Sequence, residues 1–400
     1  MTASAPAPLA TLSGDRGRNE FVLDPERRHL NHGSYGAVPV RTIEYQHALK
    51  QHLEANPFRW FEELPGRHAG ARASLAAFVG ARADEIAMVP SASAAASVVF
   101  ANVPLGPGDE VLVTDHVYGA VAMGAARAAR RSGANVRSVP IPLSVDADET
   151  LERMLSAVTT RARIVVVDHI SSATARGFPV QALADALAAR DVVLAIDGAH
   201  ALGILPAPAI RSPHVVWFGN LHKFACAPRG AATVVAQGEL AQRLFPLIDS
   251  WGAELPYPER FDLQGSIDTT GFLAAPHAVE TIEAQFGWDR IRRYSAELGS
   301  WAAALVAGQL AALMNDDPMP GLGMPVPQQP LLRLPRGVAE DARSARMLKD
   351  RLAAETGCET GISSWSGRGL LRISAHAYSE PSDWEYFAER GVRVIASMRP

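Results

Sequence analysis

The sequence predicts an α/β protein whose large domain holds a mostly parallel, seven-stranded sheet and whose smaller C-terminal domain is α+β. Short apolar runs alternate with Ala-rich amphipathic stretches between residues 85 and 235, and this alternation of strand and helix patterns is typical of a parallel sheet. The runs at 165–167 and 192–196 are unbroken, as expected of strands buried on both faces. Long helical patterns replace the alternation after residue 275.

Seven apolar runs give the strands of the large domain. They lie at 85–89, 110–115, 135–139, 164–168, 192–197, 215–218 and 231–235. Helical periodicity is found at 40–53, 92–100, 120–131, 151–158 and 180–189. The connecting helices are therefore expected to cover both faces of the sheet.

The C-terminal part combines long helices with a predicted strand pair. The helices are expected at 276–286, 288–314 and 339–355, around a Pro/Gly-rich stretch at 318–335, and the strands at 331–334 and 370–374. We therefore expect a flexible N-terminal arm at 1–20, a large domain at 21–275 whose first residues could pack on the small domain, and a small domain at 276–400.

Composition limits the classes of function. The chain has 400 residues, 48% of them hydrophobic and 20% charged, and a net charge of −4, so we expect a small-molecule substrate and neither nucleic acid nor membrane as a partner. No apolar run typical of a signal peptide occurs at the start. Two cysteines, Cys226 and Cys358, are too few for a disulfide framework and too far apart for a metal knuckle, which favours the cytoplasm and predicts no metal.

Lysine is scarce in this chain. Of the three lysines, Lys50 and Lys349 lie in charged helical stretches and are interpreted as surface residues. Lys223 instead follows the predicted buried strand 215–218, and ligands of open α/β sheets bind beyond the carboxyl ends of strands. Partial desolvation there lowers the pKa of an amine and frees it for Schiff-base chemistry.

Asp197 ends the predicted strand 192–197 and gives Lys223 a chemical context. A buried carboxylate beside a pyridine nitrogen keeps that nitrogen protonated, which a pyridoxal 5′-phosphate ring needs as an electron sink; capping of the next helix is the alternative role. His200 follows within one helical turn and could donate to the phenolic oxygen of such a ring. Together they predict a pyridoxal 5′-phosphate site.

Two further segments offer the remaining contacts of such a cofactor. Ser91, Ala92 and Ser93 directly follow the strand 85–89, where a helix N-terminus could hold a phosphate. His116 and Tyr118 follow the strand 110–115 and would point the same way in an extended segment. We expect His116 to stack on the ring, with Tyr118 as the alternative.

These residues resemble the class V aminotransferase family of fold-type I pyridoxal-phosphate enzymes, and within it the isopenicillin N epimerase-like branch. The resemblance covers nearly the whole chain. Its motifs are LNHGSYG at 30–36, DHVYGA at 115–120, DHISS at 168–172, DGAH at 197–200 and GNLHK at 219–223. The last two are highly specific in combination.

The resemblance implies roles for particular residues. Lys223, Asp197 and His200 would be catalytic: Lys223 forms the Schiff base and moves the Cα proton, Asp197 holds the pyridinium, and His200 supports the phenolic oxygen. The expected cofactor-binding residues also include Ser91, Ala92, Ser93, His116, Ser171, Asn220 and His222. Gly265 and Ser266 would reach the phosphate of a neighbouring subunit, which implies a homodimer with shared active sites.

The resemblance also implies a substrate site. Arg372 would clamp the substrate carboxylate through a bidentate pair, and Asn31, Gly33, Tyr35 and Arg59 would complete the substrate contacts, with Arg59 reading a second acidic group. The chain departs from the family pattern at His32, Ser91 and Ser266 and in a short segment at 251–265. These departures leave the substrate open.

Cofactor motifs do not select the reaction, because every enzyme of this kind begins in the same way. We expect an amino-acid epimerase or racemase first, then a C–S lyase acting on a cysteine conjugate or sulfoxide, and then an aminotransferase. A non-catalytic ligand sensor ranks lowest, since it usually requires a fused DNA-binding domain. Desulfuration requires a cysteine thiolate on a mobile loop, whereas Cys358 lies at a predicted strand start and Cys226 is interpreted as a packing residue.

Overall fold

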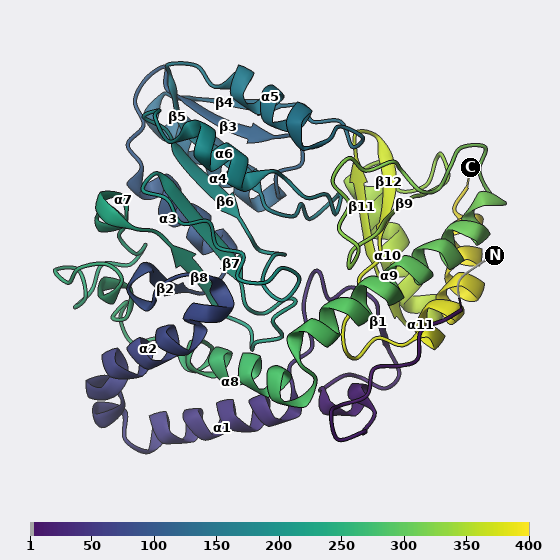
Figure 1. Cartoon of the computed structure of the whole chain (residues 1–400), viewed down its shortest axis with the longest axis horizontal. Coiled ribbons are helices and arrows are strands. Elements are labelled where there is room, and N and C mark those ends of the chain that lie inside the picture. The colour runs from purple at the N-terminus through teal and green to yellow at the C-terminus, as the bar shows by residue number, and fades with distance from the viewer. Residues whose placement is uncertain (1–3, 400) are drawn as a thin grey trace.

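The computed structural model describes residues 4–399 and is built on a mixed sheet of seven strands (Figure 1). In spatial order the strands are β2 (Ile86–Val89), β8 (Ala232–Val235), β7 (Val215–Asn220), β6 (Val193–Asp197), β5 (Ala162–Asp168), β3 (Glu110–Thr114) and β4 (Asn135–Val139). The pairs from β7 to β4 are parallel, and β8 runs antiparallel to both of its neighbours. The predicted α/β class and mostly parallel sheet are confirmed.

Helices cover both faces of this sheet because side chains alternate along each strand. Leu112 and Val165 face one core, whereas their neighbours Val111 and Val166 face the other. The first core contains α5 (Ala147–Ala157) and α6 (Val180–Leu187), and the second contains α3 (Ala92–Asn102), α4 (Gly119–Ser132) and α7 (Gly238–Gln242).

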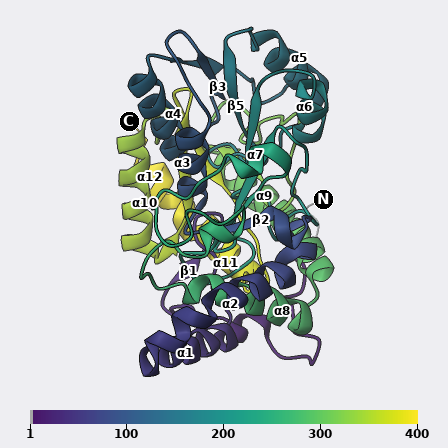
Figure 2. The ribbon, with the colours of Figure 1, turned by 90° about the vertical axis from the view of Figure 1, so that its left-hand side faces the viewer.

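A layer of three helices lies at the lower end of the large domain in both ribbon views (Figures 1 and 2). These are α1 (Val40–Ala55), α2 (Pro57–Val79) and α8 (Thr270–Gln285). Helix α2 was not predicted from the sequence; it contains the helix breakers Pro65 and Gly66. Asn56 caps its start by accepting a hydrogen bond from the Arg59 amide (3.1 Å), which satisfies one of the free amides of the first turn.

The small domain packs around its own core. Its helices are α9 (Trp288–Ala311), α10 (Ala342–Thr356), α11 (Pro381–Tyr386), the π-helix η4 (Phe387–Gly391) and α12 (Val392–Ser397). The predicted strand pair forms as β9 (Leu331–Arg333) and β12 (Arg368–Arg372), and an unpredicted strand, β11 (Gly361–Trp365), completes the sheet on the other side of β12.

The N-terminal segment is anchored to the small domain, which corrects the expectation of a flexible arm over its described part. Arg16 and Arg18 form ion pairs with Glu380 and Asp383. Further along, β1 (Arg28–His29) pairs in parallel with β10 (Cys358–Glu359). Residues 1–3 of the predicted arm lie outside the described residues.

The two cores meet along α9 rather than at the predicted residue 275. Ile291 still belongs to the core of the large domain, whereas Tyr294 belongs to that of the small domain. Conversely, Leu30 packs into the small domain. Over residues 4–399, no helix combines the length and apolarity that a membrane span requires.

Candidate active site

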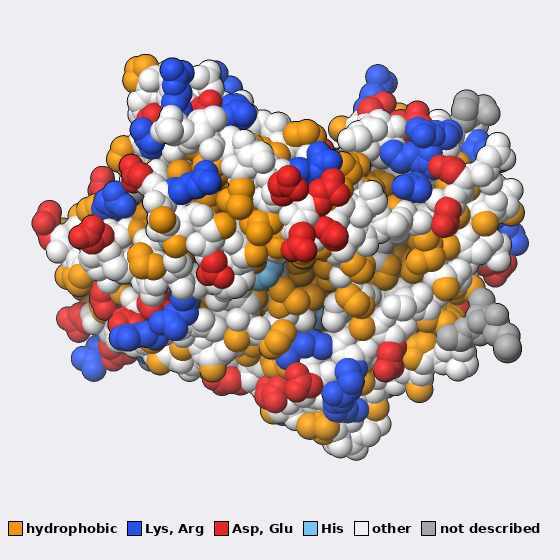
Figure 3. Space-filling model, turned by 45° about the horizontal axis from the view of Figure 1, so that its top comes forward, with side chains coloured by type: hydrophobic (Ala, Val, Ile, Leu, Met, Phe, Trp, Pro, Cys, Tyr) orange, Lys and Arg blue, Asp and Glu red, His pale blue; other side chains and the backbone are white. Residues whose placement is uncertain are grey.

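Three neighbouring strands end on polar residues at the same edge of the sheet: β5 at Asp168, β6 at Asp197 and β7 at Asn220. Asp168 and Asp197 are partners in the parallel register. A cavity of about 710 Å³ opens beyond this edge and reaches α10 and β10 of the small domain. The space-filling view shows the surface hollowed between the two lobes (Figure 3).

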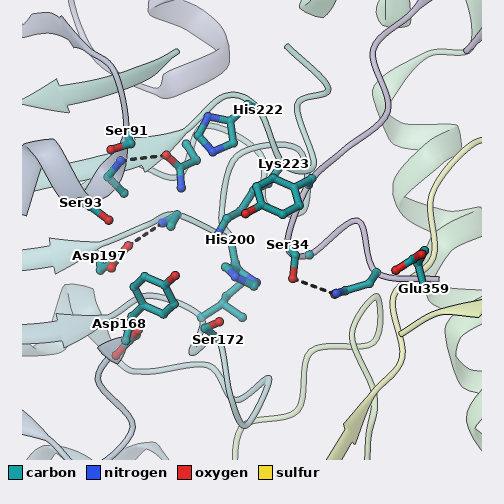
Figure 4. Close-up of a pocket in the computed structure, with 18 of the residues that line it drawn as sticks. Ser34, Ser91, Ser93, Asp168, Ser172, Asp197, His200, His222, Lys223 and Glu359 are labelled. Atoms are coloured by element: carbon teal, nitrogen blue, oxygen red, sulfur yellow. Dashed lines mark hydrogen bonds between the residues drawn. The ribbon is translucent and has the colours of Figure 1, made fainter. Parts of the chain in front are cut away.

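Residues from distant parts of the chain line this cavity (Figure 4). They include Asn31, Gly33, Tyr35, Ser91, Ala92, Ser93, Tyr118, Asp168, Ser172, Asp197, His200, Asn220, His222, Lys223, Arg346, Lys349 and Glu359. The close-up places Ser91 and Ser93 at one side, Lys223 and His200 in the middle, and Glu359 at the opposite side. The segments after β5, β6 and β7 meet here because the carboxyl ends of neighbouring parallel strands share one edge of the sheet.

Lys223 lies in the loop after β7 and is half-buried. Desolvation lowers the pKa of its amine to about 8, and the nearby carboxylate of Asp197 limits the drop. A larger fraction of the amine is therefore neutral near physiological pH than for an ordinary lysine. Such an amine is suited to nucleophilic attack on a carbonyl group.

Two buried carboxyl groups lie on the floor of the cavity. Burial raises the pKa of Asp197, whose Oδ1 accepts a hydrogen bond from the Ala199 amide (2.9 Å). Burial and the charge of Asp197 raise the pKa of Asp168 well above its usual range, and Asp168 Oδ2 has no hydrogen-bond partner among the described residues. Asp197 is therefore the member of the pair that is better able to carry the charge.

His200 is buried next to these carboxyl groups and has one free ring nitrogen. Its Nδ1 is hydrogen-bonded to Gln329 Oε1 (3.0 Å), and its Nε2 lacks a partner within the described chain. Burial and the charge of Lys223 lower its pKa well below the usual range. A neutral imidazole held at one nitrogen thus presents the other to a bound group.

The N-terminus of α3 forms an anion site at the side of the cavity. Ser91 caps the helix by accepting from the Ala94 amide (3.2 Å), and Asn220 Oδ1 accepts from the Ala92 amide (2.8 Å). The exposed Ser93 and half-buried His222 line the same side. The helix dipole and the small side chains favour a phosphate at this place.

Of the two residues expected to stack on the ring, Tyr118 lines the main cavity, whereas His116 does not. Lys223 Nζ lies 5.8 Å from the centre of the Tyr118 ring. His116 is buried, with its ring nitrogens bonded to Thr174 Oγ1 (2.7 Å) and the Ile141 carbonyl (2.6 Å). It lines only a smaller adjoining cavity, and its ring stacks on Trp365.

Arg372, at the end of β12, lines that adjoining cavity of about 340 Å³. Its guanidinium donates to Asn31 Oδ1 (2.9 Å) and to the Ser172 carbonyl. Desolvation lowers its pKa to about 10. A Cβ at Gly33 would lie 2.7 Å from Arg372 Nη2, so the glycine makes room for the guanidinium. Gly33 of the LNHGSYG motif therefore leaves space for the Arg372 guanidinium, and Asn31 of the same motif binds it as a neutral partner.

Other expected site residues lie outside the main cavity in the described chain. Ser171 is buried and bonded to Thr174 and to the Arg176 amide, whereas its neighbour Ser172 lines the cavity. Arg59 is exposed and paired with Glu63 and Glu62, so its charge is already balanced. Gly265 and Ser266 are exposed on a loop, where the sequence analysis expected them to serve another subunit.

Several lining residues were missed by the sequence analysis. Ser172, Asp168 and Glu359 carried no role in it, although Asp168 and Ser172 lie within the DHISS motif. Lys349 was interpreted as a surface residue, but it is half-buried and lines both cavities. The position of Asp168 at the end of a predicted strand could have indicated a site residue. The helical pattern around Lys349 contained no such indication.

Comparison with known proteins adds to this geometry. A model of the aminotransferase class-V family matches residues 42–310. Isopenicillin N epimerase of Streptomyces clavuligerus is 28% identical, with the alignment covering 95% of this chain and 98% of that protein. Hercynylcysteine sulfoxide lyase of Schizosaccharomyces pombe is 22% identical, with coverage of 94% and 96%.

A solved structure shares the fold. It is a mutant of the cystine C–S lyase C-DES with glycine covalently linked to its PLP cofactor, and it superposes with a TM-score of 0.75 at 16% identity, over 94% of this chain and 98% of that one. The likeness confirms the expected fold type.

The lowered pKa of Lys223 predicts how the cofactor-free protein reacts with an amine-acylating reagent. Since only the neutral amine reacts, labelling of Lys223 should rise with pH and reach half its maximum near pH 8. In urea-unfolded protein the midpoint should move to about 10.4. Peptide mass spectrometry resolves the three lysines, and Lys50 gives the internal reference for reagent loss. A folded-state midpoint equal to the unfolded one would contradict the assignment.

Proposed function

The chain belongs to the class-V aminotransferase family, and on that premise we propose that it is an amino-acid epimerase or racemase acting at the Cα of an amino acid or aminoacyl compound. Its cofactor is pyridoxal 5′-phosphate. The observation that carries the proposal is that the cavity holds Lys223 together with two phenols, Tyr35 and Tyr118, and no cysteine of the described chain.

The residues present fit the cofactor. Asp197 offers a buried carboxylate for the pyridinium nitrogen, and His200, which lines the cavity, has a buried Nε2 without a hydrogen-bond partner among the described residues. The α3 N-terminus, with Ser91 and Ser93, would hold the phosphate, and Asn220 fixes the first turn of this helix by accepting from the Ala92 amide. We assign the ring contact to Tyr118, because it lies beside Lys223.

The bound cofactor withdraws electrons from Cα and so weakens its bond to hydrogen. Lys223 would remove the Cα proton with its neutral amine, which the lowered pKa makes available near pH 8. Arg372 would hold the α-carboxylate, and Asn31 orients the guanidinium. Epimerisation also needs a proton delivered from the opposite face, and the hydroxyls of Tyr35 and Tyr118 are the candidates that line the cavity.

The cysteines argue against sulfur transfer through a protein thiol. Cys226 and Cys358 are both buried and free, and burial raises the pKa of each thiol. Neither lines the cavity. A nucleophilic thiolate needs exposure and a lowered pKa, so neither cysteine suits a desulfurase. Unpaired cysteines also fit the reducing cytoplasm that we propose as the location.

A C–S lyase acting on a cysteine conjugate or sulfoxide is the second candidate. It would use the same Lys223 and Arg372 but would expel a sulfur group from Cβ. The similarity to hercynylcysteine sulfoxide lyase over 94% of the chain favours this reading. Transamination ranks third.

We also propose a homodimer. Leu247, Ile248 and Trp251 expose large apolar side chains, and Trp251 is 92% exposed. This segment precedes Gly265 and Ser266, which would complete the phosphate site of the partner. An exposed apolar cluster of this kind is typical of a subunit interface.

The reaction can be identified by proton NMR of the cofactor-loaded enzyme in D2O with a panel of L-amino acids, including cysteine and its S-substituted sulfoxides. We expect deuterium at Cα with an intact side chain, and chiral chromatography of the same sample should show the D-form. Lys223→Ala should lower the exchange rate at least about a hundredfold. Pyruvate and ammonia would instead establish the lyase, and a keto acid formed without ammonia would establish transamination.

Arg372→Lys should raise the KM or Kd for the amino acid roughly tenfold to a hundredfold, because a lysine cannot form the bidentate pair. The visible absorption of the bound cofactor should not change. Arg368→Lys is the matched control, since Arg368 lies on the same strand but pairs with Asp316 (2.7 Å). An unchanged affinity for Arg372→Lys would contradict the assigned role.

A further inference from the structure

We propose that Lys349 binds a second anionic group of the substrate, so that the preferred substrate is an amino acid or aminoacyl compound whose side chain carries a carboxylate. This inference rests on the proposed function and narrows its substrate class. Lys349 lies on α10, at the end of the main cavity that is formed by the small domain.

Lys349 occupies the junction of the two cavities. Together with Asn31, Ser34, Tyr118 and Ser172 it lines both the larger and the smaller one. The smaller cavity contains Arg372, which is assigned to the α-carboxylate. A ligand that extends from Arg372 into the larger cavity therefore passes Lys349.

Among the three lysines, Lys349 has no carboxylate partner in the described part of the chain. Lys50 pairs with Asp268 at 3.1 Å, and Lys223 is stabilised by Asp197. Within residues 4–399, no carboxylate oxygen lies within 4.0 Å of Lys349 Nζ, and the adjacent Asp350 pairs with Arg346 (3.1 Å). Desolvation lowers the pKa of Lys349, and the charges of Arg372 and Arg346 lower it further. A half-buried amine in this position gains from an anion.

The surrounding charges also favour two anions rather than one. Arg372 is buried and its hydrogen-bond partners, Asn31 and the Ser172 carbonyl, are neutral. A single α-carboxylate can balance Arg372 but leaves Lys349 without an anionic partner, whereas Arg346 is exposed and already paired with Asp350. Glu359 lines the mouth as well, yet it is exposed, so solvent screens its charge more strongly.

Arg59 was the residue that the sequence suggested for this second contact. It is exposed and already bound to Glu62 and Glu63 on its own helix, and it does not line the cavity. The small domain thus replaces it as the source of the second positive charge.

The test is calorimetric titration of the cofactor-loaded enzyme with pairs of amino acids that match in chain length, one member acidic and the other neutral. The pairs are L-aspartate with L-asparagine, L-glutamate with L-glutamine, and L-2-aminoadipate with L-norleucine. We expect at least one acidic member to bind roughly tenfold more tightly than its neutral counterpart, the gain of a charge-assisted hydrogen bond. Lys349→Met should remove that preference and leave the neutral member unaffected, whereas Arg343→Met, on the exposed side of α10, should preserve it.

Each opposite result overturns the inference. Acidic members that bind no more tightly than neutral ones would exclude a second anion site. Equal weakening of both members by Lys349→Met would assign Lys349 to the α-carboxylate instead. The D2O experiment tests the proposed epimerisation separately: if that proposal fails, amino acids that bind will show no deuterium exchange at Cα. Met keeps the length and helix propensity of lysine, and circular dichroism verifies that both variants fold.

Discussion

The desolvation of Lys223 beside Asp197 is the interaction on which the site depends. An ammonium group in this position is disfavoured by burial and supported by a carboxylate, so its pKa settles near 8. The carboxyl group of Asp197 must be ionised to stabilise the Lys223 ammonium in this way, while Asp168, its partner in the sheet register, remains protonated. The Ala199 amide donates to Asp197 Oδ1 and thereby selects it.

The fold fixes these groups through backbone positions. Parallel pairing of β5, β6 and β7 brings Asp168, Asp197 and Asn220 to one edge, and the loop from Leu221 to Ala227 turns back across that edge. Close approach of other segments holds the loop: a Cβ at Gly36 would collide with the Lys223 carbonyl, and Gly36 N–H donates to the His222 carbonyl (3.0 Å). Two glycines of the LNHGSYG motif therefore allow close packing at the site: Gly36 against the Lys223 backbone and Gly33 against the Arg372 guanidinium.

Much of this arrangement could be predicted, because buried parallel strands are apolar and polar residues at their ends stand out. The strands of the large domain, Lys223 and Asp197 were recognised in this way. An extended segment would point His116 and Tyr118 the same way, so the pattern did not distinguish them; the chain instead turns at 115–116, and both ring nitrogens of His116 are bonded within the protein. Helix α2 was not predicted; it contains Pro65 and Gly66, and the buried Arg72–Asp262 ion pair that anchors it is a contact between segments far apart in the sequence. The place of Lys349 depends on how α10 docks on the large domain, which helix periodicity does not encode.

The central claim is that Lys223, and no other lysine, carries the cofactor. Borohydride reduction of the purified cofactor-loaded enzyme, followed by peptide mass mapping, tests it most directly because the chain has only three lysines. The account predicts a reduced phosphopyridoxyl group on the peptide that contains Lys223, with those of Lys50 and Lys349 unmodified. A modified Lys349 or Lys50 with an unmodified Lys223 would contradict it.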